Sequence, residues 1–163
     1  MRVYIHYMKD KIKTGITFST FDLLHAGHIT MLKEAKQQCD HLICGLHVDP
    51  QIERPHKNSP VQSVVERYIQ LSAVEFVDEV IPYCIEKDLY DILLTYPIDV
   101  RIIGDDYKDV EFSGKQLCID QGIDIYYNSR SHDFSSSGLR KEVAKREQEN
   151  ARKTIESQSS KDN

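Results

Sequence analysis

The sequence lacks the features that mark membrane-spanning, secreted and nucleic-acid-binding proteins. It has no run of 18 or more apolar residues, and its first segment, MRVYIHYMKDKIK, is too polar for the core of a signal peptide. Its formal net charge is -5 at pH 7, and no stretch interleaves basic with aromatic residues as a nucleic-acid surface does. We therefore expect a cytoplasmic protein with neither a membrane nor a nucleic acid as its partner.

Cysteine is also sparse. The four cysteines, Cys39, Cys44, Cys84 and Cys118, lie far apart and form no C-x-x-C pair. This spacing indicates neither a zinc knuckle nor a disulfide framework, so we expect reduced thiols that are mostly buried. No internal repeat is visible, and 163 residues are enough for one sizeable core but short for two.

What the chain does contain is a regular alternation of apolar runs and amphipathic stretches. The apolar runs predict strands at 14–18, 41–48, 76–83, 98–104 and 123–127. The stretches between them predict helices at 26–38, 61–74, 89–94 and 115–121, the last ended by Gly122. Such alternation is typical of right-handed βαβ units, so we expect a Rossmann-like three-layer α/β domain with a five-stranded parallel sheet flanked by helices.

The two ends fall outside this alternation. We expect the domain itself to span 13–147. Residues 1–12 have no clear partner and predict either an extra edge strand or a leader. Residues 148–163 are polar apart from Ile155, which predicts a frayed helix end followed by a disordered tail.

One motif stands where a ligand would bind in such a domain. His25 and His28 follow the first predicted strand and flank Gly27 at the start of the first predicted helix. Ligands of parallel α/β domains lie at the carboxyl ends of strands, and residues three apart on a helix lie about 5–6 Å from each other. We expect both imidazoles to face one ligand, with Gly27 allowing close approach of the backbone.

This motif has three possible interpretations: a metal site, a phosphate site and an ordinary surface. Zinc would require a third ligand, and the preferred i, i+4 spacing with an intervening glutamate is absent. Surface histidines are common, but the position directly after the first strand argues against that reading. The helix N-terminus favours an anion, so the motif predicts a phosphate site.

A serine cluster near the other end of the domain has two interpretations. Ser135, Ser136 and Ser137 follow the last predicted strand and precede a helical stretch. Their hydroxyls and the helix amides suit phosphate binding, although serine is also a preferred helix cap without any ligand.

The segment STFDLLHAGHITML, from Ser19 to Leu32, resembles the T-F-D-x-x-H-x-G-H signature of a nucleotidyltransferase superfamily. Its members include cytidylyltransferases and phosphopantetheine adenylyltransferase. The segment from Arg130 to Ser137 resembles the R-T-E-G-I-S-T-[ST] segment of the cytidylyltransferases, with His-Asp-Phe in place of Glu-Gly-Ile. The resemblance covers roughly residues 13–145 and lies closest to the glycerol-3-phosphate cytidylyltransferases.

The resemblance implies specific roles for individual residues. The catalytic groups would be His25, His28, Lys57 (possibly with Arg54) and Arg130. The nucleotide would be bound by Thr17, Phe18, Ser19, Thr20, Phe21, Asp22, Gly27, Arg67, Gly104, Asp105, Ser135, Ser136 and Ser137. The segment 76–82 would lie near a homodimer contact.

Two positions depart from the glycerol-3-phosphate cytidylyltransferase pattern. Ser19 stands where those enzymes have glycine, and Glu75 where they have arginine. If that arginine serves the substrate phosphate, Glu75 argues against glycerol-3-phosphate as the acceptor.

The resemblance implies transfer of CMP from CTP, accompanied by Mg²⁺, to a small phosphorylated acceptor, with glycerol-3-phosphate ahead of other polyol phosphates and of phosphonates or aminoalcohol phosphates. No general base is needed, because a phosphate dianion is already a nucleophile. Two alternatives remain: an adenylyltransferase that uses ATP, and a nucleotide-binding module without activity.

Overall fold

The computed structural model describes residues 12–129 and 134–159 and is built around a five-stranded parallel sheet. The strand order is β3-β2-β1-β4-β5. The strands are β1 (Thr14–Ser19), β2 (His41–His47), β3 (Glu79–Tyr83), β4 (Val100–Gly104) and β5 (Asp124–Asn128). This arrangement confirms the predicted Rossmann-like fold.

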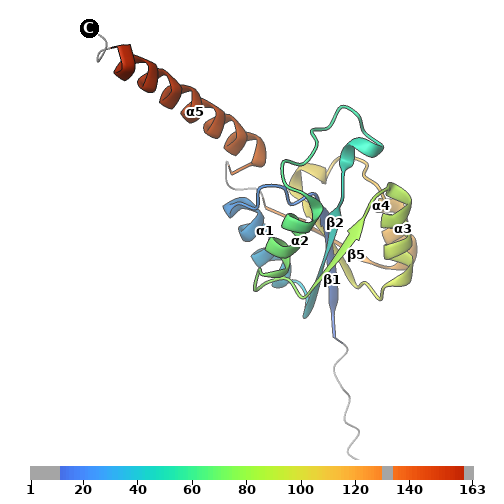
Figure 1. Cartoon of the computed structure of the whole chain (residues 1–163). Coiled ribbons are helices and arrows are strands. Elements are labelled where there is room, and N and C mark those ends of the chain that lie inside the picture. The colour runs from blue at the N-terminus through green and yellow to red at the C-terminus, as the bar shows by residue number, and fades with distance from the viewer. Residues whose placement is uncertain (1–11, 130–133, 160–163) are drawn as a thin grey trace, which may run out of the picture.

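Helices cover both faces of the sheet (Figure 1). The described helices are α1 (Ala26–Lys36), α2 (Val64–Ser72), α3 (Glu86–Thr95), α4 (Lys115–Gln121) and α5 (Ser136–Ser159), with short 3₁₀ turns η1 (Pro50–Ile52) and η2 (Asp105–Tyr107). α1 and α2 lie on one face, and α3 and α4 on the other. In the described part of the chain, no helix is long and apolar enough to span a membrane.

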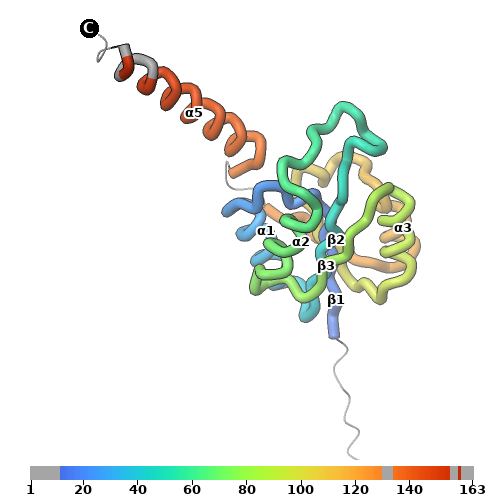
Figure 2. Tube along the Cα trace, in the orientation of Figure 1, coloured from blue at the N-terminus to red at the C-terminus, as the bar shows by residue number. Residues whose placement is uncertain are grey.

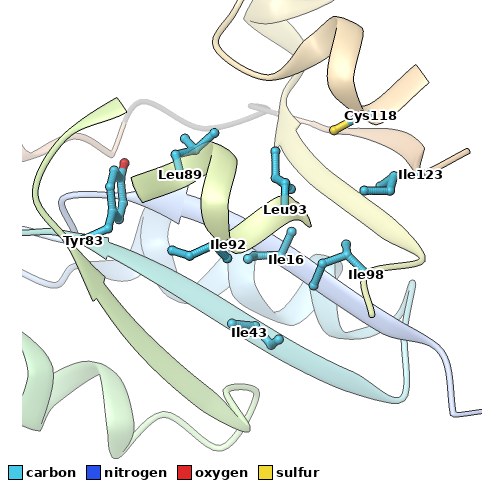
Figure 3. Close-up of a cluster of buried hydrophobic side chains, with 9 residues drawn as sticks. All are labelled: Ile16, Ile43, Tyr83, Leu89, Ile92, Leu93, Ile98, Cys118 and Ile123. Carbon is cyan, nitrogen blue, oxygen red and sulfur yellow. The ribbon is translucent and has the colours of Figure 1, made fainter. Parts of the chain in front are cut away.

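Each face of the sheet has its own apolar core. Figure 3 shows the core under α3, where Leu89, Ile92 and Leu93 pack on Ile16 of β1 and Ile43 of β2. The opposite core joins α1 and α2 to the sheet through fully buried residues, namely Leu32, Ala35 and Leu71. Burial of both sheet faces explains why the strand segments are nearly continuous apolar runs.

Helix boundaries differ from the predicted ones where polar side chains cap them. α2 starts at Val64, not at 61, because Ser63 and Glu66 form a capping box. α3 starts three residues earlier than predicted, because the Asp88 carboxylate accepts the amides of Cys84 and Ile85. Gly122 ends α4 in the left-handed conformation (φ 69°), as predicted.

The third strand is also shorter than predicted. β3 begins at Glu79, and the Asp78 carboxylate just before it accepts the amide of Leu42 (2.6 Å) and pairs with Lys36. Phe76 and Val77 pack on the core without strand pairing. These two apolar residues predicted a strand, but here they serve core packing instead.

The sequence predicts a frayed helix end and then a disordered tail from residue 148, and the structure has helix over residues 148–159. α5 continues without interruption to Ser159 and projects away from the sheet (Figures 1 and 2). Its surface carries ion pairs at i, i+4 spacing, Glu142 with Arg146 and Lys145 with Glu149, which stabilise a polar helix without tertiary packing. The tail was predicted from low hydrophobicity, which does not register such pairs. Residues 1–11 and 160–163 lie outside the described chain.

Candidate active site

A cleft of about 840 Å³ opens at the carboxyl ends of the strands. Its walls come from β1, the N-terminus of α1, β4, α3 and the start of α5. Among the residues predicted from the sequence, the cleft is lined by Thr17, Phe18, Ser19, His25, Gly27, His28, Gly104, Ser135 and Ser136. The long connection between β2 and α2 rises at the same end of the sheet (Figure 2).

The two histidines of the motif lie against each other at the mouth of α1. Their ring centroids are 4.0 Å apart, with an interplanar angle of 27°. His25 is the N-cap of α1, and its Nδ1 accepts the amide N–H of Gly27 (3.1 Å). With Nδ1 acting as acceptor, the neutral ring of His25 carries its proton on Nε2 and has a donor there. The predicted juxtaposition is therefore present.

Phe18 owes its place in the cleft to a glycine on the neighbouring strand. A Cβ on Gly45 of β2 would lie 2.1 Å from the Phe18 ring. Only glycine leaves room for the ring at that point, because such a contact is far below van der Waals distance. Phe18 in turn packs edge-on against Tyr83 at 5.5 Å.

Asp22 lies away from the cleft and holds three segments together. Its side chain is 5% exposed and accepts the amides of Val61 and Gln62 at 3.0 Å each. It also pairs with Arg140 of α5, and its carbonyl accepts the Ser136 hydroxyl (2.9 Å). Burial alone would raise the pKa of Asp22, but the two amides and Arg140 outweigh it, so the pKa lies below its ordinary value.

The turn that contains Asp22 has an unusual backbone. Phe21 and Leu23 have positive φ angles, 49° and 51°. Such conformations cost free energy in residues with a Cβ and persist only when their surroundings hold them. Here Phe21 is buried in the core and the Leu23 amide donates to Gln62 Oε1 (2.8 Å).

Arg67 also differs from its predicted role at the nucleotide. It is 2% exposed, does not line the cleft, and donates to four backbone carbonyls at 2.6–3.1 Å. Those carbonyls belong to Thr20, His47, Val48 and Gln62. Arg67 thus ties the ends of β1 and β2 to α2, a structural role that the sequence motif does not reveal.

The remaining predicted residues are divided by the structure. Thr20, Phe21, Lys57, Asp105 and Ser137 do not line the cleft, whereas Arg54, from the same loop as Lys57, does. Glu75, which departs from the family pattern, does not line the cleft either. Arg130 lies outside the described residues, so its assigned contact with phosphate stays a prediction.

Sequence reasoning missed Arg101 and Arg140. Arg101 lines the cleft from the middle of an apolar strand, and Arg140 holds Asp22 from 118 residues away. An arginine within an otherwise apolar strand was the available signal for Arg101; nothing local indicated Arg140.

The described residues offer no ready-made metal cage. No group of three His, Cys, Asp or Glu side chains within 12–129 and 134–159 is arranged to hold an ion. Both oxygens of Asp22, the carboxylate nearest the histidine motif, are engaged by amides and by Arg140.

All four cysteines are free thiols; Cys44 and Cys118 are buried, and Cys84 is exposed.

Comparisons with known proteins agree with this geometry. The chain is 31% identical over 133 residues to the glycerol-3-phosphate cytidylyltransferase of Bacillus subtilis (strain 168), which spans 82% of this chain and 98% of that enzyme. It is 38% identical over 106 residues to the bifunctional protein HldE of Paramagnetospirillum magneticum, spanning 64% of this chain but only 22% of HldE.

A solved structure shares the fold. The lipopolysaccharide core biosynthesis protein of Thermoplasma volcanium GSS1 superposes with a TM-score of 0.60 at 24% identity, covering 76% of this chain and 100% of that one. The model of the family described as cytidylyltransferase-like matches residues 16–142, which is most of the chain. The chain therefore belongs to the cytidylyltransferase-like family of nucleotidyltransferases.

Proposed function

We propose that this protein transfers CMP from CTP to a small phosphomonoester, with glycerol-3-phosphate as the first candidate, and releases pyrophosphate. The observation that carries the proposal is the stacked His25–His28 pair at the N-terminus of α1, on the wall of a cleft large enough for a nucleotide and a second small anion. Membership of the cytidylyltransferase-like family and the similarity to the Bacillus subtilis enzyme support CTP.

The reaction requires no proton transfer. A phosphate oxygen of the acceptor attacks the α-phosphorus of CTP, the bond from that phosphorus to the bridging oxygen breaks, and pyrophosphate leaves in line. The protein then needs to position two anions and stabilise charge on the α-phosphoryl oxygens. His25 donates through Nε2, His28 lies beside it, and the positive end of α1 adds to the field.

Other residues of the proposed site bind the two substrates. Ser135 and Ser136, with Arg130, are assigned to the triphosphate, because the two serines line the cleft beside the start of α5. Arg54, which lines the cleft, is assigned to the acceptor side, and a contact from Lys57 of the same loop stays a prediction from the sequence. Magnesium is proposed to arrive with CTP as part of that substrate, held by phosphate oxygens and water.

A pyrophosphate-release assay tests the proposal. With CTP, magnesium and glycerol-3-phosphate the protein should release pyrophosphate and form a CDP-alcohol detectable by mass spectrometry. ATP in place of CTP tests the adenylyltransferase alternative in the same assay. Binding of CTP without turnover across a panel of phosphomonoesters would favour the inactive module.

A homodimer belongs to the same proposal. On α2, which neighbours the edge strand β3, Val65, Tyr68 and Ile69 are 62%, 42% and 63% exposed. Apolar side chains gathered on one helix fit a contact with a second copy. Light scattering after gel filtration should give twice the chain mass, and Ile69→Glu should shift the measured mass toward that of the monomer.

The cytoplasmic location predicted from the sequence stays a prediction.

A further inference from the structure

A buried arginine on β4 faces the cleft opposite the histidines. Arg101 is 4% exposed, yet it lines the cleft. Its guanidinium carbon lies 5.2 Å from the ring centroid of Phe18 and 4.9 Å from that of Phe112. The two rings therefore pack against the guanidinium at the wall of the cleft.

The charge of Arg101 has no anionic partner among the described residues. Nη1 donates to the carbonyl of Ser113 (2.6 Å) and lies 4.0 Å from Cys118 Sγ, and no carboxylate oxygen of residues 12–129 or 134–159 is within 4.0 Å. Burial raises the pKa of nearby Tyr83 to about 12, so its phenol is neutral at pH 7. Burial lowers the pKa of Arg101 itself, but a guanidinium stays charged at neutral pH.

Burying a charge without a counter-ion costs free energy, and a bound ligand of opposite charge can offset that cost. From this arrangement we infer that Arg101 is a specificity-determining residue that binds an anionic group of the phosphorylated acceptor. The inference rests on the proposed function, since it names the substrate class for the second half of the same cleft.

The position of Arg101 favours the acceptor over CTP. The proposed triphosphate site lies at the N-termini of α1 and α5, where His25, His28 and Ser135 line the cleft. Arg101 lies instead with Tyr83, Tyr90 and Phe112, on the face covered by α3 and α4. The cytidine portion of CTP carries no anion, which leaves the acceptor as the anion on this side.

The chemistry of the site also discriminates among acceptors. A pair of aromatic rings can receive a quaternary ammonium group, but here Phe18 and Phe112 already hold a cation of the protein. A second cation would be repelled, whereas a phosphate or carboxylate would meet a fixed guanidinium suited to paired hydrogen bonds. Polyol phosphates and phosphorylated acids should therefore be preferred over choline phosphate.

The test compares the wild type with Arg101→Met, Arg101→Lys and a control, Arg146→Met, which removes an exposed arginine of α5 outside the cleft. Melting temperatures are measured alone and with inorganic phosphate or glycerol-3-phosphate, and CTP binding is measured by calorimetry. Kinetics are measured with glycerol-3-phosphate and with choline phosphate.

We expect both anions to raise the melting temperature of the wild type and of Arg146→Met, and to raise that of Arg101→Met clearly less, because only the phosphate-binding groups at α1 and α5 then remain. The KM for glycerol-3-phosphate should rise about tenfold or more, as for a lost charge-assisted hydrogen bond, with CTP affinity unchanged. The KM of Arg101→Lys for glycerol-3-phosphate should lie between those of the wild type and Arg101→Met. The free Arg101→Met protein should melt no lower than the wild type, because an uncompensated buried charge has been removed.

The inference would be overturned if neither anion stabilised the wild type, or if Arg101→Met left the KM for glycerol-3-phosphate unchanged. It would also be overturned if Arg101→Met lowered the CTP affinity, the acceptor affinity and the melting temperature together, because that result would mark a purely structural arginine. Failure of the proposed function can be told apart from failure of this inference. If the wild type formed no product from CTP, cytidylyl transfer would be refuted. Stabilisation by phosphate that depends on Arg101 would still support the anion site.

Discussion

Asp22, in the turn after β1, and Arg140, on α5, form an ion pair across 118 residues of sequence. The pair fastens the start of α5, where two of the proposed phosphate-binding serines lie, to the turn that precedes the histidine motif. Two walls of the cleft therefore depend on one partly buried contact.

Arg140→Ala should destabilise the protein by about 1–3 kcal/mol, because it leaves the buried Asp22 carboxylate with amide donors alone. Urea unfolding measures this loss. Arg146→Ala, which breaks an exposed i, i+4 pair with Glu142, should lower the unfolding free energy far less, because water screens exposed ion pairs. Equal effects of the two substitutions would contradict the structural role of the Asp22–Arg140 pair.

The Asp22 carboxylate should also make stability depend on pH. Its pKa in the folded state lies below the ordinary value of 3.8, so the folded protein takes up this proton less readily than the unfolded chain. The resulting stabilisation is complete above the unfolded pKa and is lost as pH falls through the folded one. The difference in unfolding free energy between wild type and Asp22→Asn should be constant near neutral pH and shrink with acidification below about pH 4. A difference that grows on acidification would refute this assignment.

His25 has two roles that substitutions can separate. Asn is a good N-cap, so His25→Asn should retain the stability of α1 but lose the donor toward phosphate, whereas His25→Ala should lose both. We expect His25→Ala to cost about 1 kcal/mol in unfolding free energy and His25→Asn a few tenths. Turnover should fall in both variants. Retained turnover in His25→Asn would show that the ring is needed only as a cap.

Arg67 should prove to be structural. Arg67→Met leaves four buried carbonyls without their donor and should cost about 3 kcal/mol or more. The KM for CTP should change little in the folded fraction, because Arg67 does not line the cleft. An Arg67 variant of normal stability with a much higher KM for CTP would restore the predicted contact with the nucleotide.

The parts of the fold and of the site that could be predicted are those with a local signal in the sequence. The strand and helix alternation and the His25–His28 pair were predicted because their signals lie within a few residues. The structural roles of Asp22 and Arg67 were not. The side-chain partners of Asp22 are at least 39 residues away, and three of the four carbonyls that Arg67 binds are at least 19 residues away. A motif names residue types that occur together, but it does not distinguish those that face the ligand from those that hold the loop.

Arg101 illustrates the same limit from the opposite direction. The run IDVRIIG predicts a strand and gives no role to Arg101, because only the folded chain brings Phe18 and Phe112 within about 5 Å of its guanidinium. Polar composition predicts only a frayed helix end past residue 148, whereas the i, i+4 pair of Lys145 with Glu149 lies in a helix that continues to Ser159.

The proposed role of His25 and His28 is to stabilise charge during cytidylyl transfer. The most direct measurement is pyrophosphate release from CTP with glycerol-3-phosphate by the wild type and by His28→Ala, with His41→Ala as a control on a histidine that pairs with Glu79 outside the cleft. We expect turnover by the wild type and by the control, and a loss of about 10²-fold or more in His28→Ala, as for removal of one preorganised donor. Near-normal turnover by His28→Ala would contradict the account.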